Sequence, residues 1–273
     1  MMKKLGIIAG GGSLPRQLID GCRAQGRPFA VVGLKDFALP DSIGADVGLW
    51  IRLGEAGKAV KFFHEQGVEE IVMIGPVRRP SLFQLRPDWW TAKFLAKIGF
   101  KAFGDDHLLT SVIKYIETEG FKIIGVHEVL GDILATEGVF GKIKPDEQAL
   151  ADIEHGVKIA RGLGALDVGQ SVIVQQGIVL GVEAVEGTDA LIKRCKDLKR
   201  DGLGGVLVKT KKPQQEQRAD LPTIGVSTVE NAADSGLRGI AVQAGKTLIV
   251  DRAAVVEKAD ALGLFVVGVK IRE

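Results

Sequence analysis

The segment 209–225, KTKKPQQEQRADLPTIG, holds the densest set of side chains that could act on a phosphate group. Its cations could neutralise a diphosphate, and they are Lys209, Lys211, Lys212 and Arg218. Asp220 follows them, and its carboxylate could hold Mg²⁺ or orient a water molecule. Loops after buried strands are where α/β proteins place their sites, although most charged runs are only solvated surface. We interpret four residues as candidate catalytic groups: Lys209, Lys211, Arg218 and Asp220.

Carboxylates cluster a second time in GVEAVEGTDALIKR, where a strand should turn into a helix. Oxygen ligands of this kind suit Mg²⁺ better than zinc. Glu186 and Asp189 are therefore candidate metal ligands together with Asp220, and Thr188 is a candidate substrate contact. The alternative for Thr188 and Asp189 is a helix cap, because hydroxyl and acidic side chains favour helix starts. Gln170, just before a predicted hairpin, could face the same site or be an exposed amide.

A glycine turn near the start of the chain could bind a phosphate. It stands between a predicted strand and a predicted helix, and it consists of Gly10, Gly11, Gly12 and Ser13. Backbone amides and a helix N-terminus attract anions there, although Pro15 stands where a dinucleotide fingerprint needs its third glycine. The alternative is merely a tight connection, in which Ser13 is a helix cap rather than a nucleophile. Arg79, in GPVRRP, is a further candidate phosphate contact or a solvated turn residue.

The first half of the chain should position the glycine turn. Short runs rich in Val and Ile alternate there with amphipathic stretches, and the runs are Leu5–Ala9, Phe29–Leu34, Leu49–Leu53, Glu70–Gly75 and Lys122–His127. Continuous hydrophobicity indicates strands buried on both faces of a parallel sheet that helices cover. Residues 1–130 are therefore predicted to form a Rossmann-like α/β domain with a mostly parallel sheet.

The second half predicts a mixed α/β domain. Residues 131–144 mix Gly, Pro and charged residues and show no sustained hydrophobic period, which predicts a linker. Residues 145–273 then form the C-terminal domain. The segments SVIVQQGIVLGVEA and GIAVQAGKTLIVD predict hairpins, with tight turns at Gln176–Gly177 and Ala244–Gly245. Helices are expected near residues 189–199, 228–235 and 252–262.

Composition narrows the class of function. The 273 residues carry a formal net charge of +2, which gives no global field that would indicate binding to nucleic acid. Cys22 and Cys195 lie far apart in the sequence and offer neither a disulfide framework nor a thiolate metal site. This use of cysteine fits a protein of the reducing cytoplasm. The histidines show no HxxxH or HxxE spacing, so a zinc hydrolase is unsupported. Since no run approaches about 18 consecutive apolar residues, we expect a soluble cytoplasmic protein.

One aromatic segment allows contact with lipid. PDWWTAKFLAKIGFKAFGDD combines Trp89 and Trp90 with phenylalanines and lysines, so it could shelter acyl chains or lie peripherally against the inner membrane. Ordinary packing is the favoured interpretation, because apolar stripes with lysine on the far face are routine in helices.

Six segments in chain order resemble the LpxI-type UDP-2,3-diacylglucosamine pyrophosphatases: IAGGGSLP, GPVRRP, GDDHLL, DVGQSVIVQ, EAVEGTDALI and KPQQEQRADLPTIG. The resemblance covers nearly the whole chain. It implies a Mg²⁺-dependent homodimer with a Rossmann-like N-terminal domain and a C-terminal α/β domain. The family reaction is attack of water on the diphosphate of UDP-2,3-diacylglucosamine, which releases UMP and 2,3-diacylglucosamine 1-phosphate in lipid A synthesis. The important aspartate of the family maps to Asp220.

Two other classes of function stay open. The glycine turn and Asp36, just beyond the second predicted strand, suggest a nicotinamide-dependent oxidoreductase. Pro15 argues against that class, and so does the position of the only tyrosine, Tyr115, inside a predicted amphipathic helix. A non-catalytic sugar-nucleotide or lipid-binding protein would bind the diphosphate without consuming it.

Overall fold

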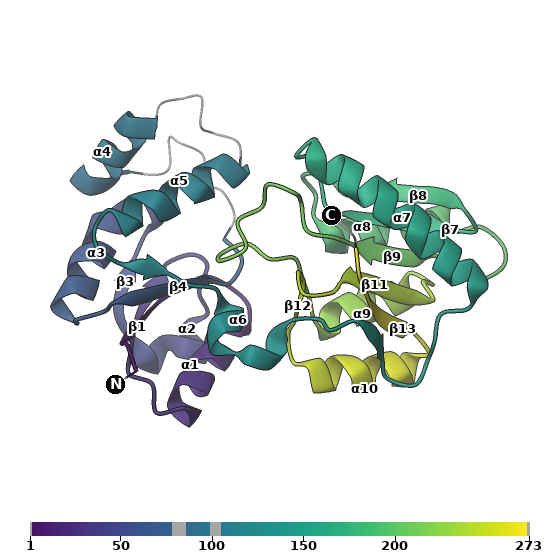
Figure 1. Cartoon of the computed structure of the whole chain (residues 1–273), viewed down its shortest axis with the longest axis horizontal. Coiled ribbons are helices and arrows are strands. Elements are labelled where there is room, and N and C mark those ends of the chain that lie inside the picture. Colours follow the sequence, from purple (N-terminus) through teal and green to yellow (C-terminus); the bar gives the residue numbers. More distant parts are fainter. Residues whose placement is uncertain (1, 78–85, 99–104, 272–273) are drawn as a thin grey trace. The chain divides into compact units, whose positions relative to one another are not determined.

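The computed structural model describes residues 2–77, 86–98 and 105–271, and the chain divides into two compact units. The first unit is Met1–Gly131 with Glu216–Asp220, and the second is Asp132–Gln215 with Leu221–Glu273. Each unit is a sheet covered by helices (Figure 1), which confirms the predicted α/β class. Within the described ranges, no helix combines the length and apolar character needed to cross a membrane.

A parallel sheet of five strands forms the first unit, in the order β3-β2-β1-β4-β5. Its strands are β1 (Leu5–Ala9), β2 (Phe29–Leu34), β3 (Val47–Ile51), β4 (Glu70–Ile74) and β5 (Lys122–Ile123). β1 pairs in parallel with both β2 and β4, so the strand order reverses between β1 and β4. Ligands of open α/β sheets bind beyond the carboxyl ends of the strands at such a switch point. The Rossmann-like prediction is confirmed.

Helices cover both faces of this sheet: α1 (Leu14–Ala24), α2 (Pro40–Ile43), α3 (Ala56–Glu65), α4 (Trp89–Ile98), α5 (Asp105–Glu117) and α6 (Val126–Val129). Ala30, Val32 and Leu34 of β2 share a core cluster with Phe63 of α3 and Ile113 of α5. The intervening residues of β2 point to the other face and are buried as well. Burial on both faces is why the strand sequences are continuously apolar.

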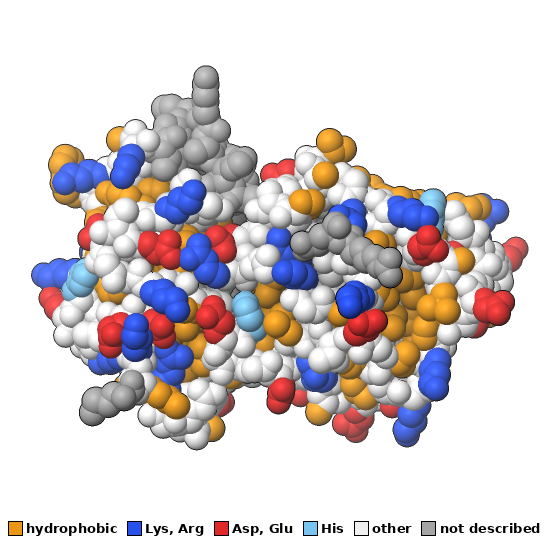
Figure 2. All heavy atoms as spheres, viewed as in Figure 1, with side chains coloured by type: hydrophobic (Ala, Val, Ile, Leu, Met, Phe, Trp, Pro, Cys, Tyr) orange, Lys and Arg blue, Asp and Glu red, His pale blue; other side chains and the backbone are white. Residues whose placement is uncertain are grey.

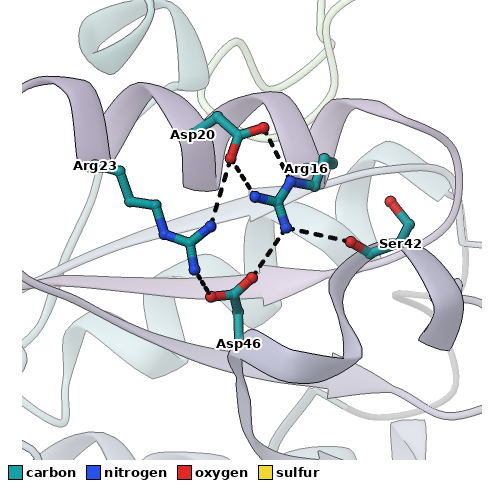
Figure 3. A network of polar contacts seen from close by, with 5 residues as sticks. All are labelled: Arg16, Asp20, Arg23, Ser42 and Asp46. Atoms are coloured by element: carbon teal, nitrogen blue, oxygen red, sulfur yellow. Dashed lines mark hydrogen bonds and ion pairs between the residues drawn. The ribbon is translucent and has the colours of Figure 1, made fainter.

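Charged side chains hold α1 against the 3-10 turn Gly44–Asp46 that precedes β3 (Figure 3). Arg16 donates to Asp20 and, at 3.1 Å, to Asp46, while Arg23 also pairs with Asp46. The hydrogen bond from Arg16 lowers the pKa of Asp20. Because α1 directly follows the glycine turn, this network also fixes the end of that turn.

The second unit contains a six-stranded sheet in the order β6-β13-β11-β9-β7-β8. The strands are β6 (Gly138–Phe140), β7 (Ser171–Gln175), β8 (Ile178–Val182), β9 (Val206–Lys209), β11 (Gly239–Gln243) and β13 (Phe265–Val269). β9, β11 and β13 are parallel, and β6, β7 and β8 run antiparallel to their neighbours. Two short strands, β10 (Thr223–Ile224) and β12 (Leu248–Ile249), form a separate parallel pair.

The two faces of this sheet have different cores. α7 (Glu147–Ala165) contributes Ile153 and Ala160 to the cluster on one face. The other face is covered by α8 (Thr188–Cys195), α9 (Val226–Asp234) and α10 (Arg252–Leu262), which contribute Leu191, Val229 and Val255.

In the space-filling view, acidic and basic side chains lie interspersed over the first unit (Figure 2).

One of the two predicted hairpins is confirmed and the other is wrong. β7 and β8 pair antiparallel around Gln176 and Gly177, which have φ angles of 52° and 79°. β11, by contrast, pairs in parallel with β9 and β13, while β12 pairs with β10. The reason is burial, because every residue of β11 is buried and the strand lies between two neighbours inside the sheet. A tight turn after a strand predicts that the chain reverses, but not which strand it joins.

A buried carboxylate on α7 supports the confirmed hairpin. Asp152 is 1% exposed, and its oxygens accept the backbone N–H of Gln176 at 2.9 Å and of Gly177 at 2.7 Å. Gln148 donates to the same carboxylate at 3.2 Å. Asp152 therefore joins the β7–β8 turn to the helix that covers the sheet.

The segment 131–144, which the sequence predicts as a linker, contains regular structure. It holds the 3-10 turn Gly131–Ile133 and β6, whose Val139 pairs with Val267 of β13. The strand is only three residues long, which is too short to produce a detectable period of hydrophobicity.

Asp146 gives α7 a stability that depends on pH. Its side chain accepts the backbone N–H of Ala149 at 2.8 Å and pairs with Arg238, which together lower its pKa below the usual 3.8, the Arg238 hydrogen bond most. A lowered pKa stabilises the fold above the ordinary pKa, and this stabilisation is lost as acidification protonates the folded carboxylate. Asp146→Asn keeps the capping oxygen but removes the charge.

We therefore expect Asp146→Asn to melt below the wild-type protein at neutral pH, with the gap in melting temperature narrowing as the pH falls below the usual carboxyl pKa of 3.8. Circular dichroism melts of both proteins across this range measure the gap. A gap that stays constant with pH would contradict the assigned role of the charge.

Candidate functional site

Polar side chains gather where β9 and β11 of the second unit reach their carboxyl ends. Lys209 is the last residue of β9, and it lies opposite Ser171, the first residue of β7. Gln243 ends β11 and accepts the backbone N–H of Lys211 at 2.9 Å. Carboxyl ends of parallel strands are the usual location of sites in α/β proteins. This edge is therefore the best candidate site within the second unit.

Four side chains at this edge form what we call the Lys209 cluster: Ser171, Glu183, Thr188 and Lys209. Nζ of Lys209 donates to Oγ1 of Thr188 at 2.8 Å, and the Thr188 hydroxyl donates to Oε1 of Glu183 at 2.8 Å. Oγ of Ser171 lies 3.3 Å from Oγ1 of Thr188. Lys209 and Glu183 are each only 6% exposed. The cluster thus places an ammonium and a carboxylate in a largely buried setting, with a hydroxyl between them.

The local backbone explains how these residues meet. Gly187, at φ 83°, turns the chain from β8 into α8, so that Thr188 opens the helix. Gly169 lies so close to residue 183 that a Cβ atom there would be 2.0 Å from the Glu183 carbonyl oxygen. The N–H of Glu183 also donates to the carbonyl of Ser171 at 2.9 Å. The loops on either side of the β7–β8 hairpin are thereby held together.

Other predicted residues of this unit lie close by. Nζ of Lys211 donates to the carbonyls of Lys212 at 3.0 Å and Pro213 at 3.2 Å. Lys212 itself pairs with Asp167 at 2.6 Å. The backbone N–H of Gln170 reaches Oε2 of Glu183 at 3.3 Å, and Oε1 of Gln170 is buried without a hydrogen-bond partner. Gln170, Thr188 and Lys209 are therefore brought together through Glu183.

The predicted metal ligands of this unit have protein partners. Glu186 pairs with Arg194 at 2.8 Å, and its pKa is lowered, first by its own backbone N–H and then by Arg194. Oδ1 of Asp189 accepts a hydrogen bond from Asn231 at 3.1 Å. Among the residues that the structure describes, no three His, Cys, Asp or Glu side chains are grouped so that they could hold a metal ion.

The glycine turn lies in the first unit, after β1. The N–H of Gly10 donates to the Ile74 carbonyl at 2.7 Å, and that of Gly11 to the Pro76 carbonyl at 3.0 Å. Gly75, at φ 92°, approaches so closely that a Cβ atom would lie 2.4 Å from the Gly11 oxygen. The turn is thus packed against the end of β4, and two of its amides serve that packing.

The rest of the glycine turn leads into α1. Ser13 occupies the N-cap position, but its hydroxyl makes no capping hydrogen bond, contrary to the predicted cap role. Gly12 is exposed at φ 74°, so any anion would meet the amides from Gly12 onward. The predicted phosphate contact Arg79 lies outside the described residues.

Asp220 and Arg218 belong to the segment Glu216–Asp220 of the first unit. The guanidinium of Arg218 donates to both carboxylate oxygens of Glu216 at 3.0 Å and to Glu117 of α5 at 2.7 Å. The bonds to Glu216 raise the pKa of Arg218 further. Asp220 is half-buried, and its N–H donates to the Glu216 carbonyl at 2.9 Å. Arg218 therefore anchors the loop that carries Asp220.

Sequence patterns alone did not indicate two residues of this edge, Ser171 and Gln243. Both are small or neutral polar residues at the ends of apolar runs, and such residues are common at strand ends. The pairing of Ser171 with Lys209 could have revealed the first, but pairing of distant strands is not readable from local pattern.

Comparisons with known proteins cover both units. Models of the LpxI N-terminal domain and the LpxI C-terminal domain match residues 4–133 and 136–267. The chain is 46% identical over 282 residues to UDP-2,3-diacylglucosamine pyrophosphatase LpxI of Caulobacter vibrioides, covering 100% of this chain and 99% of that protein.

Two of the solved structures that match the chain are only distantly similar to it. N5-carboxyaminoimidazole synthase of Aspergillus clavatus with ADP and 5-aminoimidazole ribonucleotide shares 15% identity at a TM-score of 0.23, over 72% of this chain and 44% of that chain. A complex with ATP from the same organism gives 14% identity and the same TM-score, over 72% of this chain and 45% of that chain. Neither similarity bears on the function of this chain.

Proposed function

The chain belongs to the LpxI family, and we propose that it hydrolyses the diphosphate of UDP-2,3-diacylglucosamine to UMP and 2,3-diacylglucosamine 1-phosphate. The observation that carries this proposal is the 46% identity to the Caulobacter vibrioides pyrophosphatase, over 100% of this chain and 99% of that protein. A match that covers 100% of this chain and 99% of that protein supports the same reaction class, and lipid A synthesis is its setting.

The chemistry of the available donors fits Mg²⁺. This ion keeps several waters and binds through one or two carboxylates plus substrate phosphates, rather than in an all-protein cage. One or two carboxylates of the chain are thus enough, and we propose that Asp220 supplies one. Glu186, which pairs with Arg194, and Asp189, which accepts a hydrogen bond from Asn231, are further candidates. Bound Mg²⁺ would polarise the diphosphate and stabilise the charge that develops as its bond breaks.

The side chains of this chain would supply positioning and charge. The ammonium of Lys209, fixed by Thr188, would donate to a diphosphate oxygen as negative charge grows there. Lys211 would add a second cation, and Gln170 and Thr188 would orient the substrate through hydrogen bonds. The start of α1 beyond Gly12 would receive a further anionic group. Arg218 would act indirectly, because Glu216 and Glu117 engage its guanidinium.

The reaction is tested by incubating the purified protein with UDP-2,3-diacylglucosamine and Mg²⁺, with and without a chelator, and following UMP by mass spectrometry. We expect release of UMP that stops when the chelator is added and returns when Mg²⁺ is restored. Substrate that binds but stays intact would instead favour a non-catalytic binding protein. Release that continues in excess chelator would remove the metal from the proposal.

We further propose that the protein acts in the cytoplasm as a homodimer, with peripheral contact to the inner membrane where its substrate resides. Light scattering after size-exclusion chromatography tests the dimer, and sedimentation with phospholipid vesicles tests the membrane contact.

A further inference from the structure

We propose that Glu183 is a positioning residue that orients the Lys209 ammonium through the hydroxyl of Thr188. The inference rests on the proposed function, because it concerns how Lys209 is presented to the diphosphate. The family comparisons assign no role to Glu183, and the sequence places it only among the carboxylates of GVEAVEGTDALIKR whose oxygens would suit Mg²⁺. Its carboxylate lies one hydroxyl away from Lys209, between the β8–α8 turn and the carboxyl end of β9.

The direction of each hydrogen bond in this chain of groups is fixed by chemistry. A lysine ammonium only donates, and an ionised carboxylate only accepts. Thr188 therefore accepts from Lys209 and gives its single proton to Glu183, with both distances at 2.8 Å. Ser171, 3.3 Å from the same hydroxyl, can then act only as a donor to Thr188. Glu183 thus sets the rotation of the hydroxyl whose lone pairs receive Lys209.

Burial makes this arrangement costly to disturb. Lys209 and Glu183 are each 6% exposed, so water offers little replacement for a lost partner. The other carboxylate oxygen of Glu183 accepts the N–H of Gln170 at 3.3 Å. The carboxylate is therefore held from two sides, and it offers Thr188 a fixed acceptor.

Substitution by glutamine separates this role from simple packing. The glutamine amide has the same shape, but one of its two ends donates. If the amide oxygen faces Thr188, the amide nitrogen meets the N–H of Gln170, and the reverse orientation presents a donor to the Thr188 hydroxyl. Either orientation forfeits one bond and the negative charge. With the amide oxygen towards Thr188, the hydroxyl keeps only a neutral acceptor whose other end is no longer held by Gln170. With the amide nitrogen towards Thr188, the hydroxyl loses its acceptor and is no longer held with its lone pairs towards Lys209.

The experiment is a double-mutant cycle on UMP release with Glu183→Gln, Thr188→Val and the double variant. We expect each single substitution to lower kcat roughly 10- to 100-fold while KM changes less, since displaced catalytic groups reduce rates on this scale. If Glu183 acts through Thr188, its substitution changes kcat little once the hydroxyl is absent. The double variant should then match the Thr188→Val protein.

Glu230→Gln is the matched control, because it removes a carboxylate of the same unit that pairs with Lys258 on neighbouring helices. It should leave kcat unchanged. If the two substitutions act independently, kcat of the double variant falls by the product of the two single factors. That result would overturn the inference and leave the proposed reaction intact. So would a Glu183→Gln protein with wild-type kcat. A wild-type protein that releases no UMP would instead overturn the proposed function itself.

Discussion

Asp220→Ala should lower kcat for UMP release on the order of 10³-fold, because it removes the carboxylate that we propose holds the metal ion against the diphosphate. The side chain is half-buried in the segment Glu216–Asp220, whose anchors are Arg218 and the backbone bond to Glu216. The substitution leaves both anchors in place. We therefore expect a folded protein that binds the lipid substrate but does not cleave it.

The measurement compares single-turnover rates of UMP release at several Mg²⁺ concentrations, beside far-ultraviolet circular dichroism. Asp201→Ala is a suitable control, since that aspartate is exposed in a bend of the second unit. Asp220→Asn keeps a weak oxygen ligand, so excess Mg²⁺ should restore part of its rate and none of the rate of Asp220→Ala. A well-folded Asp220→Ala protein with normal turnover would exclude Asp220 from the reaction.

The largest effect on stability is expected at Asp152. Its buried carboxylate accepts two backbone N–H groups of the β7–β8 turn, and hydrogen bonds to charged acceptors are the stronger kind. Asp152→Ala should therefore reduce the free energy of unfolding by roughly 2–3 kcal/mol. That loss corresponds to a fall in melting temperature of about 5–10 °C for a domain of this size.

Glu154→Gln on the same helix is the matched control, because its carboxylate is exposed and forms a surface ion pair with Lys158. Its melting temperature should stay close to that of the wild-type protein. Hydrogen exchange adds a local test, since the amides of Gln176 and Gly177 should lose protection first in Asp152→Ala. A variant that melts with the wild-type protein would show that the turn needs no support from α7.

The strands β1 and β2 of the first unit were predictable because burial on both faces of the sheet leaves a continuous apolar run in the sequence. Leu5–Ala9 and Phe29–Leu34 were predicted with the bounds that the structure has. The second hairpin failed for a related reason, since the same continuous apolar pattern in β11 is compatible with any neighbour in the sheet. Local sequence indicates that a strand is buried, whereas its partners depend on contacts between distant segments.

The candidate site was predictable in its residue types more than in its contacts. Lys209 and Thr188 were singled out from separate motifs, and the structure joins them by a hydrogen bond. Arg218 was predicted as a catalytic cation because cations that follow a buried strand could neutralise a diphosphate. The charged loop gave no sign that Glu117, far away in the chain, is a partner of Arg218. Long-range ion pairs of this kind leave no local pattern.

The division of the chain has a consequence for any attempt to separate its halves. The polypeptide passes between the two units after Gly131, after Gln215 and after Asp220. A single cut near residue 131, although it respects the limits of the two family-domain matches, would place Asp220 on the fragment opposite to Glu117 and α5. Neither fragment would then contain a complete first unit. The two halves of the sequence therefore cannot be separated as two complete domains. Gene fusions or split versions of this protein would need to keep the segment Glu216–Asp220 with the N-terminal sequence.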